Sequence, residues 1–338
     1  MNAGEETGGR AGAPFDWAVA ILSAVFVGGL YLDGWAHAHG WVDQSFFTPW
    51  HAVFYAGYAA TAAVLVGTLL SRHARGHSWR RGAPPGYELS LLGVAVFALA
   101  GAGDMLWHIL FGIEAGTQAL LSPTHLGLAL GMGLIVTGPL RAARRRRGPA
   151  AGWRAQGPMV LALTSLLSVL TLFTLYAHPI VQPAASAGHP YAGSESMGVA
   201  SILLQTGLLM GIVLLALRSL ALPAGALTVM ITLNAAGMGF LSIQGDYPLA
   251  LVAAAGAAGL LADLLRAFLD PTAGSPRAVR LFAFGVPAVF YVCYFLALML
   301  TEGVAWSVHA WTGAIVLAGA AGWLLSYLVL PPRSVEGG

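Results

Sequence analysis

Residues 15–70 read FDWAVAILSAVFVGGLYLDGWAHAHGWVDQSFFTPWHAVFYAGYAATAAVLVGTLL, which is two apolar runs joined by a short segment richer in polar residues. Each run has the roughly 20 residues that a helix needs to cross the hydrocarbon core of a bilayer. Two such runs with a short connection pack most simply as antiparallel neighbours. The stretch therefore predicts a hairpin of two membrane-spanning α-helices.

The rest of the chain continues this pattern. Of its 338 residues, 57% are hydrophobic and only 9% are charged, and the mean hydropathy is +0.74. A soluble domain of this length cannot bury so much apolar surface. We therefore expect an all-α, polytopic membrane bundle whose partner is the lipid bilayer and not a nucleic acid. About ten spans are predicted, at roughly 15–36, 48–70, 88–110, 123–141, 158–177, 197–217, 223–243, 248–268, 280–300 and 304–330.

The charges predict how these spans are oriented. The chain has no Lys, and with ten spans all 16 of its Arg lie on the side of the N-terminus. The positive-inside rule then places both termini in the cytoplasm. Eight of the 10 His lie on the opposite, extracytoplasmic side. The Arg-, Ala- and Gly-rich usage indicates a GC-rich genome, so we expect the cytoplasmic membrane of a bacterium.

The same features divide the chain into five segments. Residues 1–14 lack the basic start and the cleavage site of a signal peptide, so we expect a retained cytoplasmic tail. Residues 15–141 form a first half of four spans, and the Arg-rich residues 142–157 form a cytoplasmic loop. Residues 158–330 form a bundle of six spans, and residues 331–338 form a second cytoplasmic tail.

A short motif occurs twice in the first half. Residues 33–37 (DGWAH) precede residues 48–51 (TPWH), and residues 104–108 (DMLWH) precede residues 122–125 (SPTH). Asp and His four residues apart share one helix face, and Ser or Thr followed by Pro is a strong helix start. We therefore predict a tandem repeat of helical hairpins, spans 1–2 and 3–4, in which each turn gathers one Asp and two His.

These six side chains are candidate metal ligands at the extracytoplasmic side. Imidazole together with carboxylate suits transition metals, and ionisable groups in membrane spans are costly enough to indicate a function. Six ligands can hold one crowded ion or two ions, and two neighbouring metals suit oxygen activation or hydrolysis. We favour copper or iron over zinc. The predicted ligands are Asp33, His37, His51, Asp104, His108 and His125.

Four further residues extend the candidate site. His309 lies near the start of the last span and Glu114 follows His108 in its turn, and we assign both as candidate catalytic groups. His39 and His178 are additional candidate ligands. The structural alternative for His309 is an interfacial side chain packed between Trp306 and Trp311. For Glu114 it is a solvated loop acid, and for His178 a loop residue. For the six predicted ligands it is interfacial side chains that cap helix ends and hydrogen-bond each other.

A membrane helix that carries Asp-x3-His, with a further His beyond it, resembles the metal site in the C subunit of particulate methane and ammonia monooxygenases. Both motifs of this chain match that pattern. The resemblance implies a copper-dependent membrane oxidoreductase with its site on the extracytoplasmic side. It covers only these short stretches, and the duplication and the ten-span architecture are not those of that subunit.

The function predicted from these observations is that of an integral membrane metalloprotein. We expect a copper or di-iron oxidoreductase that acts on a hydrophobic or small substrate. A zinc-dependent membrane hydrolase, a non-enzymatic copper- or metal-handling protein and a haem-binding membrane protein are the alternatives, and the paired Asp residues count against haem. Expected partners are other membrane subunits or an extracytoplasmic donor of metal or electrons.

Overall fold

The structure is all-helical over the residues that it describes. It is a computed structural model, and it divides the chain into two compact units, Met1–Thr174 and Leu175–Gly338. Nine helices in the described part of the chain are long and apolar enough to cross a membrane, and Ala226–Phe240 is a shorter apolar helix. The predicted multi-pass helical bundle is therefore confirmed. The described residues are 7–41, 48–112, 114, 116–146, 152–188, 194–219, 221–242, 248–272 and 274–329.

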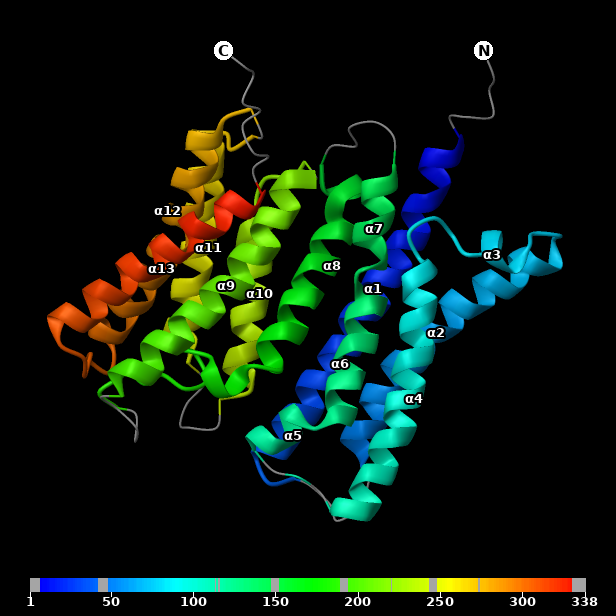
Figure 1. Ribbon diagram of the computed structural model, residues 1–338, viewed down its shortest axis with the longest axis horizontal. Helices are drawn as coiled ribbons and strands as arrows, with labels where there is room; N and C mark the ends of the chain where they lie inside the picture. The colour runs from blue at the N-terminus through cyan, green and yellow to red at the C-terminus, as the bar shows by residue number, and fades with distance from the viewer. Residues whose placement is uncertain are drawn as a thin grey trace, which may run out of the picture. The chain divides into compact units, whose positions relative to one another are not determined.

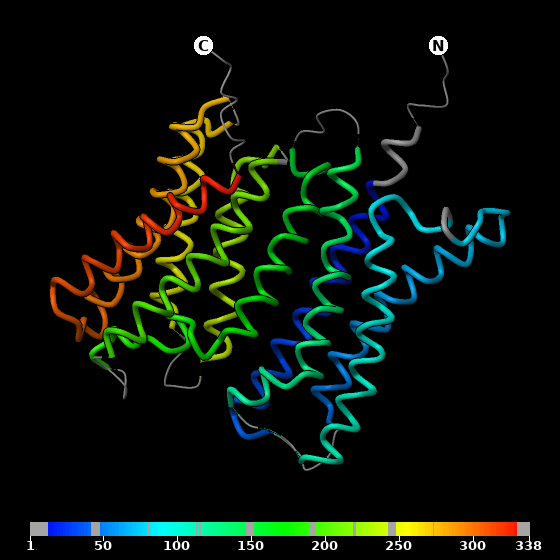
Figure 2. The backbone as a smooth tube through the Cα atoms, in the orientation of Figure 1, coloured from blue at the N-terminus to red at the C-terminus, as the bar shows by residue number. Residues whose placement is uncertain are grey.

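The first unit is built mainly from two helical hairpins and the helix α8, which packs against α1 (Figure 1). α1 pairs with α2, α4 pairs with α6, and α1 also packs on α8. Figure 2 traces the two hairpins in blue and in cyan to green, and α1 and α4 end where α2 and α6 begin, at the same end of the unit. The helices are α1 (Thr7–Ala38), α2 (Pro49–Ala74), α3 (Trp79–Gly82), α4 (Glu88–Phe111), α5 (Thr117–Leu121), α6 (Pro123–Val136), α7 (Gly138–Arg145) and α8 (Trp153–Leu172).

Glycines let the helices of each hairpin approach closely. A Cβ on Gly57 of α2 would lie 2.8 Å from the Cα of Phe26 on α1, and a Cβ on Gly131 of α6 would lie 2.9 Å from the Cα of Phe97 on α4. Backbones this close leave no room for a larger residue, as in other membrane helix pairs built on small residues. The rings of Phe26 and Phe97 then meet edge to face, with centroids 5.0 Å apart, where the two hairpins touch.

The other end of this unit is held by a buried polar cluster. The hydroxyl of Tyr87 donates to Asp16 Oδ1 at 2.5 Å, and Asp16 is also paired with Arg146. Burial raises the pKa of the Tyr87 phenol above its usual value, which keeps the donor protonated. Because Asp16 belongs to α1 and Tyr87 precedes α4, this cluster ties the two hairpins together at the end opposite their turns.

The second unit is a chain of helix pairs. α10 packs on α11, α11 on α12, α12 on α13 and α13 on α9. Asp263 accepts hydrogen bonds from the backbone N–H and the hydroxyl of Thr228, both at 2.8 Å, which fixes the start of α10 against α11. The elements are the 3-10 turn η1 (Leu175–Ala177), α9 (Glu195–Ser219), α10 (Ala226–Phe240), α11 (Leu249–Leu269), α12 (Pro276–Leu300) and α13 (Val308–Val329).

The observed helices differ from the predicted spans in four places. α8 covers Trp153–Leu172, whereas the predicted fifth span is 158–177, so the helix begins inside the predicted loop 142–157. α1 begins at Thr7, inside the predicted tail 1–14. The fourth span, Pro123–Arg145, counts as one of the nine long helices but is divided at Thr137, where α6 ends and α7 begins. The seventh span is a helix of only 15 residues. Residues 1–6 and 330–338 of the predicted tails, and 147–151 of the Arg-rich loop, lie outside the described residues.

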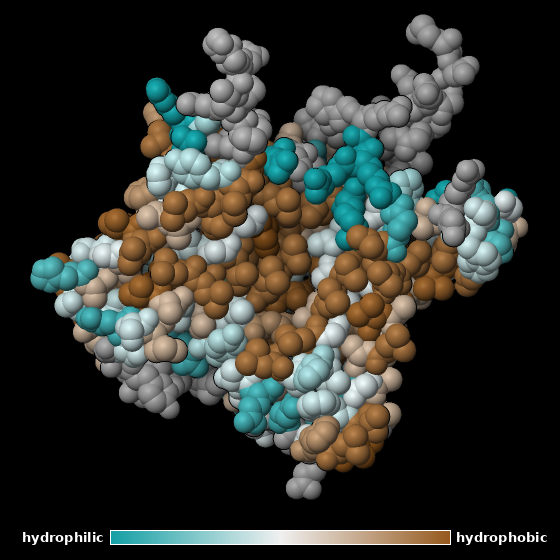
Figure 3. All heavy atoms as spheres, viewed as in Figure 1, coloured by the Kyte–Doolittle hydropathy of each residue, from teal (hydrophilic) through white to brown (hydrophobic). Residues whose placement is uncertain are grey.

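Hydrophobic residues cover the sides of the helices. In Figure 3 they lie over most of the middle of α2 and α4, while hydrophilic residues gather toward helix ends. Leu99, Ile109 and Leu106 on α4 are 75%, 71% and 54% exposed. Exposed apolar surface of this kind carries no free-energy penalty when lipid, rather than water, surrounds the helices.

Candidate metal centre

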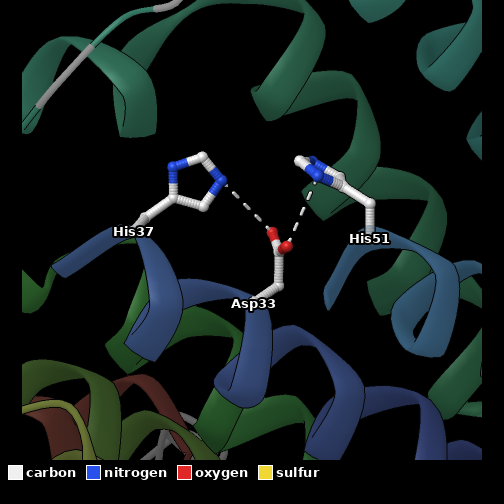
Figure 4. A group of neighbouring side chains, drawn as sticks. All are labelled: Asp33, His37 and His51. Carbon is white, nitrogen blue, oxygen red and sulfur yellow. Dashed lines mark ion pairs between the residues drawn. The ribbon is translucent and has the colours of Figure 1, made fainter. Parts of the chain in front are cut away.

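The first His/Asp group lies where the α1–α2 hairpin turns. Asp33 on α1 is only 8% exposed. Its Oδ2 lies 3.7 Å from Nε2 of His37, one turn later on α1, and its Oδ1 lies 3.5 Å from Nδ1 of His51 on α2. Figure 4 shows the two imidazoles on either side of the carboxylate. The sequence motif therefore brings these three side chains together.

The second group has the same arrangement in the α4–α6 hairpin. Asp104 on α4 is 1% exposed. Its Oδ2 lies 3.4 Å from Nε2 of His108, and its Oδ1 lies 3.5 Å from Nδ1 of His125 on α6. In both groups the first His therefore presents Nε2 and the second presents Nδ1 to the same carboxylate. The candidate ligand atoms of each group lie within 4.8 Å of one another.

The cap residues fix the second His of each group. Thr48 Oγ1 accepts from the backbone N–H of His51 at 3.1 Å and also lies 2.9 Å from its Nδ1. Ser122 Oγ makes the same two contacts with His125, at 3.3 and 2.5 Å. A side-chain oxygen that satisfies a free N–H is what starts a helix there. The Ser/Thr-Pro-x-His sequence therefore positions an imidazole as well as a helix.

The distances within each group suit a metal better than direct hydrogen bonds. An N–H···O hydrogen bond has its heavy atoms about 2.7–3.2 Å apart, whereas the four His–Asp separations are 3.4–3.7 Å. Two ligand atoms that each lie about 2.1 Å from a tetrahedral metal are about 3.4 Å apart. Each His–Asp pair therefore has the spacing of two ligands of a tetrahedral ion, and the two His of a group face different oxygens of the same carboxylate.

The two groups share one small cavity in the first unit. It measures about 40 Å³, which is room for an ion with a water or another small ligand. Both carboxylates and the second His of each hairpin line it, and the remaining walls are mostly apolar. Its lining residues are Leu30, Asp33, His51, Phe54, Tyr55, Phe97, Asp104, His125, Leu128, Ala129, Met132 and Phe173.

Few hydrogen bonds compensate the two buried carboxylates of the cavity among the described residues. Asp104 accepts one hydrogen bond, from Thr124 Oγ1 at 2.8 Å. Asp33 Oδ1 is buried and has no hydrogen-bond partner among the described residues. Burying a carboxylate without such compensation is expensive. A bound cation would offset this cost, which is a physical reason to expect one.

Glu114 adds a third carboxylate on the side of the second group. Its Oε1 accepts from Trp107 Nε1 at 2.6 Å. Its Oε2 is buried without a hydrogen-bond partner in the described part of the chain, and it lies 3.8 Å from Nδ1 of His125. His108 in turn donates Nδ1–H to the carbonyl of Gly112 at 3.3 Å, a contact that leaves Nε2 directed at Asp104. Such outer contacts orient the ligands of metal sites.

The remaining predicted residues are not members of either group. His39 donates Nδ1–H to the carbonyl of Trp35 at 2.9 Å and stacks on its ring. His178 belongs to the second unit, where it is buried and accepts at Nδ1 from the backbone N–H of Ile180 at 3.3 Å. Burial lowers its pKa to about 3, so the imidazole is neutral. His309, also in the second unit, is exposed in the first turn of α13.

Sequence reasoning missed two contributors to this cavity. Tyr55 follows His51 by four residues and stacks near it, with ring centroids 6.4 Å apart. Thr124, inside the second helix start, holds Asp104. The helical spacing from His51 to Tyr55 was a usable signal, because residues four apart share a face.

Comparisons with protein-family models, with curated proteins and with solved structures find no match to this chain. The fold and the side-chain geometry therefore carry the functional argument.

Proposed function

We propose that this chain is an integral membrane metalloprotein whose two His/Asp groups bind transition-metal ions, and that it acts as an oxidoreductase. The observation that supports this most is the occurrence of two groups with the same ligand types and the same spacing around one cavity. A single buried Asp–His pair is a common structural contact. Two equivalent sets with ligand-like distances are what a dinuclear centre needs.

The donor set is compatible with a redox metal. Each group offers two imidazole nitrogens and one carboxylate, a set that copper, iron and zinc all accept. Copper or iron supplies one-electron chemistry when bound, while the protein residues hold the ions in a largely apolar cavity and exclude bulk water. Electrons would come from a partner subunit or from an extracytoplasmic donor.

The orientation belongs to the same proposal. With ten spans, the Arg residues fall on the side of the N-terminus, and the positive-inside rule makes that side cytoplasmic. The hairpin turns that carry the two groups then face the extracytoplasmic side of a bacterial cytoplasmic membrane. A site at this depth accepts metal from outside the cell and substrates from the bilayer.

The test is the metal content and redox state of the full chain. The protein is purified from membranes in mild detergent without chelators and analysed for elements, optical absorption and electron paramagnetic resonance. We expect stoichiometric copper or iron with a signal that changes on reduction. The matched control is His77→Ala, which removes a His of the loop after α2 and should leave the metal unchanged.

Two results would contradict the proposal. Stoichiometric zinc with no redox signal would support the zinc hydrolase instead. A protein that binds no metal after incubation with copper, iron and zinc would leave both groups as structural Asp–His contacts.

A further inference from the structure

A groove runs along the side of the first unit between α2 and α4. Its volume is about 650 Å³, within the usual range of small-molecule sites. Small and aromatic side chains form most of its walls, and no carboxylate, Lys or Arg is among them. The lining residues are Thr48, Pro49, His51, Ala52, Tyr55, Tyr58, Ala98, Gly101, Ala102 and Met105.

The groove ends at the candidate metal centre. Its lining and that of the buried cavity have two residues in common, His51 and Tyr55. His51 is also a member of the first His/Asp group. These two side chains therefore form a wall common to both spaces, and one of them is a candidate metal ligand.

The position of Tyr55 depends on a glycine opposite it. A Cβ on Gly101 would lie 3.0 Å from the Tyr55 hydroxyl oxygen and 3.3 Å from its Cε1. The ring therefore rests against α4 at a position where a larger residue would crowd it. Tyr58 lies one turn further along α2 and donates its hydroxyl to the carbonyl of Val94 at 2.8 Å, so it fixes the far part of the wall.

The groove opens toward the surface that lipid covers. Ala52, Ala98 and Ala102 are exposed, and they lie on helices long enough to span a membrane. Their neighbours Val53 and Leu99 are 46% and 75% exposed. The surface over α2 and α4 is mostly hydrophobic in Figure 3. The molecules that reach this groove are therefore those dissolved in the bilayer.

We propose that this groove binds a linear hydrophobic molecule, such as a long-chain alcohol or alkane, and delivers one end of it to the metal centre. The chain lies against Ala98 and Ala102, whose small, exposed side chains leave a channel. Thr48 and His51 are the polar groups at the end of the groove nearest the centre. This inference rests on the proposed function for its endpoint, and it adds the substrate class and the entry route.

The test is saturable photolabelling of the metal-loaded full chain in lipid nanodiscs. The probe is a linear alkyl alcohol with a terminal diazirine, and unlabelled dodecanol is the competitor. We expect labelled peptides from the groove faces of α2 and α4, and excess dodecanol should reduce that labelling by about tenfold. Labelling by probe that is only dissolved in the lipid around the protein is not reduced by dodecanol at a low mole fraction.

Groove-filling variants separate binding in the groove from contact with surrounding lipid. Ala98→Phe and Ala102→Phe place a ring in the channel, and each should reduce the competed labelling by about tenfold. Leu99→Phe is the matched control, because it changes a lipid-facing residue of the same helix outside the groove. Elemental analysis and size-exclusion chromatography of each variant establish that metal and fold are retained.

The outcomes distinguish this proposal from the proposed function. Labelling that dodecanol does not reduce, or that Ala98→Phe and Ala102→Phe leave at the level of Leu99→Phe, would overturn the groove site even if the metal is present. Saturable groove labelling in a chain that binds no metal would overturn the metal centre and the delivery route, while the binding of the alkyl chain would stand.

Discussion

At the scale of single residues, the two buried carboxylates Asp33 and Asp104 are the most unusual feature of this chain. Each faces two imidazoles at 3.4–3.7 Å, and each lies among apolar side chains of a shared cavity. Membrane-buried acids of this kind are retained for function far more often than for stability. Predictions at this scale concern what each side chain binds and when it is charged.

The first prediction is the number of ions. If each group binds its own ion, His51→Ala and His125→Ala should each lose about one metal equivalent per chain, because losing one of three ligands usually abolishes tight binding. The double variant should bind none. Elemental analysis against protein concentration measures this, with His77→Ala as the control. Loss of all metal in either single variant would indicate one shared ion.

The second prediction concerns His178 in the second unit. Its pKa is about 3 in the folded protein, because the ring is buried, against about 6.5 when unfolded. Below the unfolded value the unfolded chain binds a proton that the folded chain does not. Stability should therefore fall as the pH drops from about 6.5 toward 3.

His178→Asn should reduce this dependence, since asparagine does not titrate and its side-chain oxygen can still accept the N–H of Ile180. The measurement is the thermal midpoint in detergent as a function of pH. His309→Asn removes an exposed His of the same unit and serves as the control. An unchanged pH profile in His178→Asn would show that other groups cause the acid sensitivity.

At the scale of elements, the two hairpins of the first unit match in the spacing of their motif and packing residues. Gly57 and Gly131 each follow the second His of their motif by six residues, and Phe26 and Phe97 each precede the Asp by seven. The close contacts Gly57–Phe26 and Gly131–Phe97 thus occupy matching positions in the two hairpins. We expect α1–α2 to superpose on α4–α6, with Asp33 on Asp104.

The third prediction tests this correspondence. Gly57→Ala and Gly131→Ala should lower stability by similar amounts, about 1–3 kcal/mol, because the new methyl group must push a backbone away. Gly67→Ala and Gly133→Ala are controls on the same two helices, where a Cβ meets nothing within 4 Å or only Leu166 at 3.9 Å. The free energy of unfolding of each variant, measured in mixed detergent, gives this loss of stability. A large cost at Gly57 and none at Gly131 would contradict equivalent packing.

At the scale of the whole molecule, the distribution of Arg residues decides the orientation. The fourth prediction is that reporter fusions at residues 45, 185 and 303 lie outside the cytoplasm and that fusions at 78 and 150 lie inside. The short helix α10 is the decisive element, because omitting it would reverse every later segment. A cytoplasmic signal at 303 together with an external signal at 185 would show that α10 does not span.

The sequence by itself determined the features that depend on local chemistry. Apolar runs specify spans because lipid leaves the backbone no partner but its own helix. The four-residue spacing placed Asp33 beside His37 and Asp104 beside His108, and the Thr-Pro and Ser-Pro starts placed His51 and His125 at helix beginnings. The length of α10 and the division of the fourth span at Thr137 were not foreseen, since helix ends depend on neighbouring contacts as well as on composition.

Only the tertiary structure decided which of these polar groups meet. It brought both groups to one cavity, placed Glu114 beside His125, and turned His39 back onto its own helix. It also opened the groove between α2 and α4 on the other side of Tyr55. The cavity and the groove join residues on different helices, and they follow from how closely the helices approach at Gly57, Gly101 and Gly131. The periodicity of a single helix carries no information about that approach.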